Sequence, residues 1–179
     1  MKYVSLNHNS SPTSFMKAVI NGLAPDKGLY YPQESVTLSK EFIESIKDID
    51  DVEICYEIIN RYIGDEIPKS KLIDIIDKTI SFKMPLKKIN DSIYSLELFH
   101  GPTLAFKDIG AKFMAQCLDY FKTNYSSKKI TVLVATSGDT GGAVARGFLG
   151  TKDIEVCILY PKGKISNVQE QQITTNGNY

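Results

Sequence analysis

From residue 92 to the end of the chain, short apolar runs of strand length alternate with segments of helical periodicity. The expected strands cover residues 93–99, 130–135 and 154–160, and the expected helices cover residues 111–121, 141–148 and 166–173. Strands that alternate with helices form parallel sheets through right-handed crossovers, so this part of the chain predicts an α/β fold with a parallel sheet. The β-branched run at 130–135 indicates a buried strand.

The first 90 residues carry helical patterns instead. Apolar spacing predicts helices near Phe15, after Ser39, after Asp51 and at Pro68, with Ser39 and Asp51 as N-caps. The sequence Pro-Asp-Lys-Gly at 25–28 predicts a turn, because proline presets φ and glycine accepts a positive φ. A boundary near residues 84–91 therefore divides the chain into a mainly helical region, 1–90, and an α/β region, 91–179.

Three strands would leave a parallel sheet with an open edge. The chain also stops soon after the last helical pattern. We therefore expect it to be the front part of a larger protein.

The composition argues against several classes of protein. Acidic and basic residues balance at 21 each, so nucleic acid is not an expected partner. The chain shows neither a signal peptide nor an apolar run long enough for a bilayer, so we expect no membrane partner and a cytoplasmic location. With His8 and His100 as its two histidines, it predicts no metal site. Cys55, Cys117 and Cys157 are expected to be free, buried thiols.

Residues 100–108 read His-Gly-Pro-Thr-Leu-Ala-Phe-Lys-Asp and connect an apolar run to an amphipathic helix. A lysine at such a crossing can be shielded from water and lose its proton. A neutral amine can form a Schiff base with an aldehyde cofactor, which an ammonium group cannot do. Lys107 is therefore a candidate catalytic residue, although a lysine taken alone is usually a solvated side chain.

Residues 136–142 read Thr-Ser-Gly-Asp-Thr-Gly-Gly and lead from an expected strand into an expected helix. Open α/β sheets bind ligands at this edge, and a helix N-terminus offers free N–H groups to a carboxylate or phosphate. The structural alternative is an ordinary turn, with Asp139 or Thr140 as N-cap. The glycine spacing matches neither a P-loop nor a dinucleotide-binding loop.

The two loops support each other, because each follows an expected strand and both would face one crevice. One loop offers an amine and the other an anion cradle, and an amino-acid substrate needs both. Taken singly, His100 is typical of a loop or core histidine, and Asp108 of an acid in a first helical turn.

The segments at 100–108 and 136–141 closely resemble the cofactor-lysine motif of the threonine synthase family and the loop that follows it. Residues 22–30, Gly-Leu-Ala-Pro-Asp-Lys-Gly-Leu-Tyr, are similar to the N-terminal signature of that family. Residues 159–166, Leu-Tyr-Pro-Lys-Gly-Lys-Ile-Ser, are similar to the exit of its third strand. The resemblance covers nearly the whole chain.

The resemblance implies a pyridoxal-phosphate enzyme of fold type II, with a helical N-terminal region ahead of a cofactor-binding domain that is incomplete at 91–179. It implies a lyase of threonine biosynthesis, which converts O-phospho-L-homoserine and water to L-threonine and phosphate. Lys107 would hold the cofactor and move protons on the substrate, and Asp139 would lie near the 3′-oxygen of the cofactor. The substrate carboxylate would be bound by Ser137, Gly138, Thr140 and Gly141.

Members of the family are longer, and their groups for the cofactor phosphate and the pyridine nitrogen lie beyond residue 179. We therefore expect this chain alone to bind the cofactor poorly and not to turn over. Lys162 and Lys164 either attract the substrate phosphate or are solvated surface lysines. Other readings stay open: another fold-type-II phospholyase or dehydratase, an inactive truncated product, and an anion-binding domain without a covalent cofactor. The sequence predicts no oligomeric state.

Overall fold

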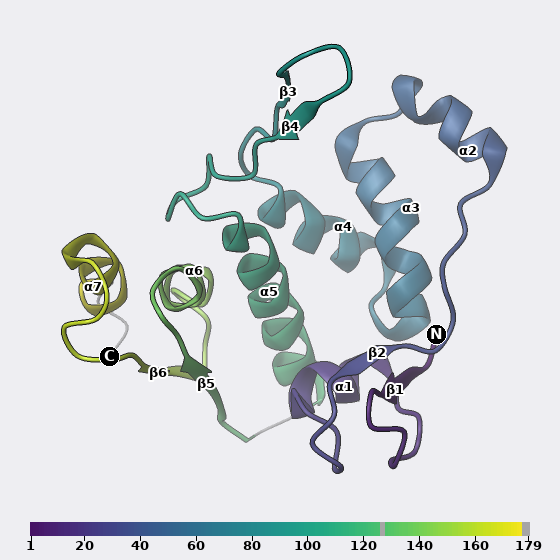
Figure 1. Cartoon of the computed structure of the whole chain (residues 1–179). Coiled ribbons are helices and arrows are strands. Elements are labelled where there is room, and N and C mark those ends of the chain that lie inside the picture. Colours follow the sequence, from purple (N-terminus) through teal and green to yellow (C-terminus); the bar gives the residue numbers. More distant parts are fainter. Residues whose placement is uncertain (126–127, 177–179) are drawn as a thin grey trace. The chain divides into compact units, whose positions relative to one another are not determined.

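The computed structural model describes residues 1–125 and 128–176 (Figure 1). The chain forms two compact units, Met1–Asp77 and Lys78–Tyr179. Strands alternate with helices in the second unit, and the predicted α/β class is confirmed. The functional division into 1–90 and 91–179 stays a prediction, because packing alone does not define what each region does. No helix within the described ranges is long and apolar enough to cross a membrane.

The first unit begins with a short antiparallel strand pair. β1 (Tyr3–Ser5) pairs with β2 (Tyr30–Pro32), and α1 (Phe15–Asn21) lies between them in the chain. Glu66 caps α1 from a distant segment, because its carboxylate accepts the N–H groups of Phe15 and Met16, both at 2.8 Å. This contact ties the start of the chain to the helices that follow.

The turn predicted at residues 25–28 is present, and Asp26 organises it. The Asp26 carboxylate accepts hydrogen bonds from the Ser5 hydroxyl at 2.6 Å and from the Gly28 N–H at 3.0 Å. These bonds, above all the one from Ser5, hold the pKa of Asp26 below its usual value. The positive φ of 67° belongs to Lys27 and not to the glycine.

Three helices complete the first unit. They are α2 (Lys40–Ser45), α3 (Asp51–Ile63) and α4 (Lys69–Thr79), with 3₁₀ turns at Ile46–Asp48 and Gly64–Glu66. Ser39 caps α2 as predicted, by accepting the Phe42 N–H at 3.1 Å. The cap of α3 is Asp50 and not the predicted Asp51, because the Asp50 carboxylate reaches two N–H groups of the first turn. The core of the unit is formed by Ile63, Ile67, Leu72, Ile75 and Ile76.

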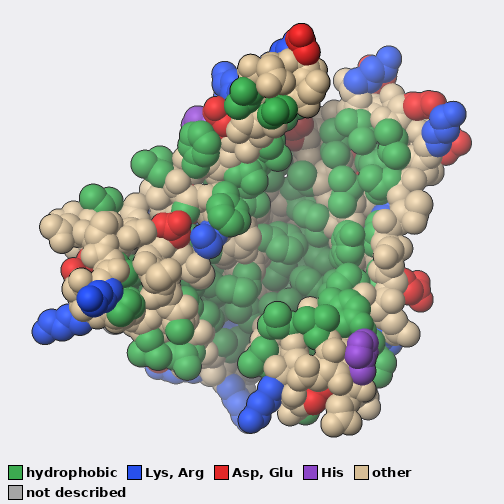
Figure 2. Space-filling model, in the orientation of Figure 1, with side chains coloured by type: hydrophobic (Ala, Val, Ile, Leu, Met, Phe, Trp, Pro, Cys, Tyr) green, Lys and Arg blue, Asp and Glu red, His purple; other side chains and the backbone are tan. Residues whose placement is uncertain are grey.

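The prediction of a first parallel strand at residues 93–99 is wrong both in its length and in its pairing. Within residues 93–99 only β4 (Tyr94–Leu96) is a strand, and it pairs antiparallel with β3 (Leu86–Lys88). Asn90 closes this hairpin by accepting the N–H groups of Ser92 and Ile93, both at 3.0 Å. Local turn chemistry therefore decides the pairing. Hydrophobic side chains are exposed over the hairpin (Figure 2).

The parallel sheet consists of two strands in the described part of the chain. β5 (Ile130–Ala135) pairs in parallel with β6 (Ile154–Leu159), as the sequence predicts. The helices α6 (Asp139–Gly147) and α7 (Asn167–Thr174) lie on the same side of these strands (Figure 1). Leu133 and Leu159 of the two strands are exposed. The prediction that 130–135 is a buried strand is therefore wrong, because burial alternates along β5.

Close packing of α5 (Lys107–Tyr125) against α6 fixes the second unit. The closest approach is at Gly147, where a Cβ would lie 3.0 Å from the carbonyl carbon of Ala111 and 3.1 Å from its oxygen. At the far end of α5, Lys122 Nζ forms an ion pair with Asp153 at 2.7 Å, which holds the pKa of Asp153 below its usual value. The two helices are thus held at a distance that excludes a larger side chain at Gly147.

We expect Gly147→Ala to destabilise the fold by about 1–3 kcal/mol, because the new methyl group would press on backbone atoms that cannot move aside. The matched control is Gly110→Ala in α5, where a Cβ would meet no atom within 4 Å. That change should stabilise the helix by up to about 1 kcal/mol. Urea unfolding of both variants measures the difference, and equal effects would show that the helices do not meet at Gly147.

The three cysteines are free, as predicted, but they are not equally buried. Cys117 is buried in α5, Cys55 is half-buried, and Cys157 is exposed on β6. The prediction of a buried thiol is therefore wrong for Cys157, which lies among the exposed alternate positions of its strand. Burial raises the pKa of the Cys117 thiol to about 12.

Alkylation should separate these thiols. At about pH 8 we expect iodoacetamide to modify Cys157 at least about a hundred-fold faster than Cys117, since the thiolate is the nucleophile. In urea, where the environment of Cys117 is lost, both should react at similar rates. Peptide mass spectrometry gives the two rates, and rapid labelling of Cys117 in the folded chain would contradict its placement in the core.

Candidate functional site

The two loops singled out in the sequence end at neighbouring helix N-termini. Lys107 is the first residue of α5 and Asp139 is the first residue of α6. Lys107 Nζ lies 3.8 Å from Asp139 Oδ2, within ion-pair distance. The structure therefore brings the candidate amine and the candidate anion loop together, although the strand ahead of Lys107 is not in the parallel sheet.

Asp108 organises the loop that carries Lys107. Its buried carboxylate accepts the Thr103 N–H at 2.9 Å and the Thr103 hydroxyl at 2.5 Å. The Leu104 N–H donates to the Gly101 carbonyl at 3.1 Å, and Leu104 adopts a left-handed φ of 60°. Asp108 does lie in the first turn of its helix, as predicted, and it also ties the loop back on itself one residue from the candidate lysine.

The second loop is organised by Thr136, whose hydroxyl accepts the N–H groups of Gly138 and Gly141, both at 3.0 Å. The N-cap position of α6 is Gly138, which has no side chain to offer. The prediction of Asp139 or Thr140 as N-cap is therefore wrong. The Thr136 hydroxyl, just before the loop, accepts the Gly141 N–H group that a cap at Asp139 would bond. The Asp139 carboxylate is thereby left to face Lys107.

Two glutamines of α7 hold both loops, and the sequence did not single them out. Gln169 Nε2 donates to Asp139 Oδ1 at 2.7 Å, and Gln172 Nε2 donates to the Thr103 carbonyl at 3.2 Å. A Cβ at position 138 would lie 2.5 Å from the Gln169 side chain, so this contact requires Gly138. The signal available in the sequence was the spacing of Ser166 and Gln169, which form a capping box at the start of α7.

Lys107 borders a largely apolar cavity of about 560 Å³. The walls come from the loop ahead of α5, from α5 and from α6, and include Phe106, Met114, Thr140 and Val144. Lys107 Nζ lies 4.5 Å from the centre of the Phe106 ring, and the lysine side chain is 33% exposed. The amine is thus partly shielded, on the side where the aromatic ring and the two helices lie.

The other residues of the loop 137–141 surround this point in different ways. Thr140 lines the cavity, Gly138 and Gly141 are buried, and Ser137 is exposed. Among the described residues, the backbone N–H groups of Ser137, Asp139 and Thr140 donate no hydrogen bond. These N–H groups lie at a helix N-terminus, where an anion is stabilised.

Three further residues named in the sequence, one histidine and two lysines, lie outside the contact between the two loops. His100 is exposed, and its ring bonds to Glu97 Oε2 at 2.8 Å. Lys162 and Lys164 are exposed in the turn that follows β6. Nothing in their geometry links these three side chains to Lys107.

Comparison with known proteins gives a consistent result. Residues 2–80 match the family model described as threonine synthase N terminus. Threonine synthase of Buchnera aphidicola is 44% identical over 178 residues, and that of Escherichia coli is 41% identical over 177 residues. Each alignment covers 99% of this chain and 41% of the relative. The chain therefore spans about two-fifths of the length of the curated relatives it matches.

Solved structures agree with the sequence matches. The crystal structure of Escherichia coli threonine synthase superposes with a TM-score of 0.87 and 40% identity, covering 98% of this chain and 40% of that one. The structure of threonine synthase from Brucella melitensis, described as bound to PLP, gives a TM-score of 0.88 and 36% identity, covering 96% and 38%. The fold of this chain is that of the α/β class to which these solved threonine synthases belong. Within that class, the resemblance to the threonine synthase family is confirmed, and this chain matches the N-terminal portion of its members.

The role of Asp108 in holding the lysine loop can be tested by Asp108→Asn. The change removes the charge that strengthens both bonds to Thr103, and we expect it to lower the free energy of unfolding by about 1–2 kcal/mol. The control is Asp119→Asn in the same helix, which should change stability by less than about 0.5 kcal/mol. Urea unfolding and the exchange rate of the Thr103 amide are the measurements, and an unchanged exchange rate would contradict the proposed clamp.

Proposed function

We propose that this chain supplies the cofactor lysine and the carboxylate-binding loop of a threonine synthase, which forms L-threonine and phosphate from O-phospho-L-homoserine and water. The observation that carries the proposal is the 3.8 Å approach of Lys107 Nζ to Asp139 at two adjoining helix N-termini. It is supported by the match of the whole chain to threonine synthases. The cytoplasmic location expected from the sequence stays a prediction.

The residues around Lys107 fit pyridoxal phosphate. A primary amine stands at the rim of an apolar cavity large enough for an aromatic ring, and a carboxylate lies beside the amine. Phe106, Met114 and Val144 would hold the ring, and Asp139, beside the Lys107 amine, would contact the cofactor near its 3′-oxygen. When bound, pyridoxal phosphate supplies an electron sink for the pair of electrons left when a proton leaves the substrate α-carbon.

Lys107 has two tasks in this proposal. Its amine holds the cofactor at rest, and afterwards it moves protons at the α- and β-carbons of the substrate. A proton must leave each of these carbons before the γ-phosphate is expelled. Protons then return to the γ-carbon, which becomes the methyl group of threonine, and to the α-carbon, and water adds its hydroxyl group at the β-carbon. A single base placed at a helix N-terminus, with a carboxylate to fix its position, suits this sequence of transfers.

The loop 137–141 would bind the substrate carboxylate. Its N–H groups at Ser137, Asp139 and Thr140 donate to no protein atom among the described residues, and the N-terminus of α6 adds a partial positive charge. The Thr140 hydroxyl and the two buried glycines would allow close approach of the carboxylate. Gln169 would keep the Asp139 carboxylate turned toward Lys107 and away from the bound anion.

A titration of the purified chain with pyridoxal phosphate tests Lys107. We expect a weak visible absorbance band, and reduction with borohydride should fix the cofactor to Lys107, as read by peptide mass spectrometry. Lys107→Ala should lose the band and the modified peptide, whereas Lys112→Ala in the same helix should keep both. Modification spread over many surface lysines, with none favoured at Lys107, would contradict the proposal.

The reaction itself can be tested in a chimaera in which this chain replaces the matching portion of Escherichia coli threonine synthase. The chimaera should release phosphate from O-phospho-L-homoserine and restore growth of a threonine-requiring strain. Lys107→Ala should reduce the rate of phosphate release at least about a thousand-fold and should no longer restore growth. The chain alone should release little or none. A chimaera that acts on O-phospho-L-serine or L-serine instead would favour the alternative of another phospholyase or a dehydratase.

A further inference from the structure

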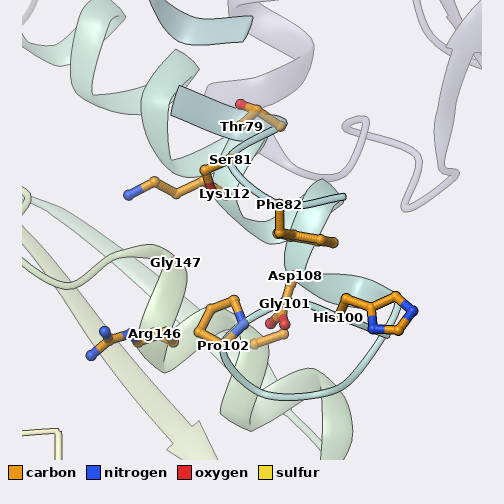
Figure 3. A pocket seen from close by; sticks show the side chains of 11 residues that line it. Thr79, Ser81, Phe82, His100, Gly101, Pro102, Asp108, Lys112, Arg146 and Gly147 are labelled. Carbon is orange, nitrogen blue, oxygen red and sulfur yellow. The ribbon is translucent and has the colours of Figure 1, made fainter. Parts of the chain in front are cut away.

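A second pocket adjoins the lysine loop and is lined by other residues of that loop than the apolar cavity. Its volume is about 330 Å³, and Figure 3 shows the side chains that line it. The lining includes Gly101, Pro102 and Asp108 of the lysine loop but neither Lys107 nor Asp139. The proposed function therefore makes no use of this pocket.

The charge of this pocket is positive. Lys112 of α5 and Arg146 of α6 line it, and among the described residues neither side chain forms an ion pair or a hydrogen bond. Both side chains extend to the same side of the view in Figure 3, away from His100. The one acidic residue of the lining is Asp108, and both of its oxygens are already bonded to Thr103. Two cations without a protein counter-charge thus share one cavity.

The rest of the lining suits an anion that carries an organic group. Thr79 and Ser81 bring hydroxyl groups to the pocket, while Phe82 and Pro102 offer apolar surface. A volume of about 330 Å³ is roughly ten times that of one water molecule, so it exceeds what a bare phosphate ion would fill. Arginine and lysine together favour a phosphate group, because its oxygens accept the guanidinium fork and the ammonium at once.

We propose that this pocket binds the phosphate group of a small phosphorylated metabolite. The doubly charged group would be held between Lys112 and Arg146, with the Ser81 hydroxyl as a further donor. The organic part would lie against Phe82 and Pro102. Free inorganic phosphate has the same binding chemistry and would occupy the charged part of the pocket more weakly.

Occupancy of the pocket would act on the lysine loop. Its lining includes Asp108, which follows Lys107 and holds the lysine loop through Thr103, and Ala143 and Gly147 of α6, the helix that begins at Asp139. A bound ligand would therefore press on the supports of both groups of the candidate active site. This consequence rests on the proposed function, whereas binding to the pocket does not.

The test is a titration of the isotope-labelled chain, followed by amide NMR at constant ionic strength and at about pH 8, where a phosphate monoester is a dianion. The probes are inorganic phosphate, O-phospho-L-serine and, as a singly charged anion, acetate. We expect shifts at Gly101, Lys112 and Gly147, with O-phospho-L-serine binding tightest and acetate at least about ten-fold weaker. Equal affinity of inorganic phosphate and O-phospho-L-serine would assign the pocket to the free ion and overturn the organic part of the proposal.

The variant Lys112→Gln/Arg146→Gln should weaken binding of O-phospho-L-serine by about ten-fold or more, because each charge-assisted bond is worth that factor. The matched control, Lys162→Gln/Lys164→Gln, removes the same charge from an exposed turn and should leave the affinity unchanged. Arg146→Lys, which keeps the charge, should recover part of the loss. Because all of these positions are exposed or half-buried, thermal unfolding should show each variant to be folded.

Two outcomes would overturn the proposal. One is an equal loss of affinity in both double variants, which would show a general effect of charge. The other is a set of shifts confined to residues 137–141, which would place the anion at the candidate active site. Lys107→Ala should leave phosphate binding intact, and Lys112→Gln/Arg146→Gln should still be modified by pyridoxal phosphate at Lys107, so failure of either proposal can be told from failure of the other.

Discussion

The close packing of α5 against α6 is the constraint on which the rest of the second unit depends. Small residues make it possible: a Cβ at Gly147 would meet the backbone of Ala111, and one at Gly141 would meet the side chain of Thr136 at 2.6 Å. With α6 set so close to its neighbours, the N-termini of the two helices fall side by side. This packing brings the Lys107 amine and the Asp139 carboxylate within ion-pair distance.

A different side chain organises the loop at each helix N-terminus, and the two termini offer different chemistry. At α5 both carboxylate oxygens of the buried Asp108 accept hydrogen bonds from Thr103. These bonds fix the loop that carries Lys107. At α6 the Thr136 hydroxyl accepts the N–H groups of Gly138 and Gly141, whereas those of Asp139 and Thr140 donate to no atom among the described residues and are open to an anion. The N-terminus of α5 thus carries an amine, and that of α6 can receive a negative charge.

The sequence predicted the parts of this unit that depend on local pattern. The strand 130–135, its parallel partner and the helices that follow them were predicted within one or two residues of where they lie, because periodicity and glycine spacing report directly on them. The strand at 93–99 was misjudged for the opposite reason. Its apolar pattern is real, but Asn90 closes a local hairpin, so β4 pairs with β3 and not with the parallel sheet. Burial of β5 and Cys157 was also overestimated, since apolar composition alone does not show which face of a strand is covered.

The glutamines of α7 show most clearly where sequence reasoning stops at the candidate site. Gln169 and Gln172 are three residues apart and so lie on one face of the helix, which the sequence does show. What it cannot show is that this face meets two loops that lie some thirty and seventy residues earlier in the chain. A neutral amide is the suitable group for this task, because it can donate to the Asp139 carboxylate without competing with Lys107 for an ion pair. The geometry of Lys107 and Asp139 therefore depends on a third helix whose contribution becomes visible only when the chain is folded.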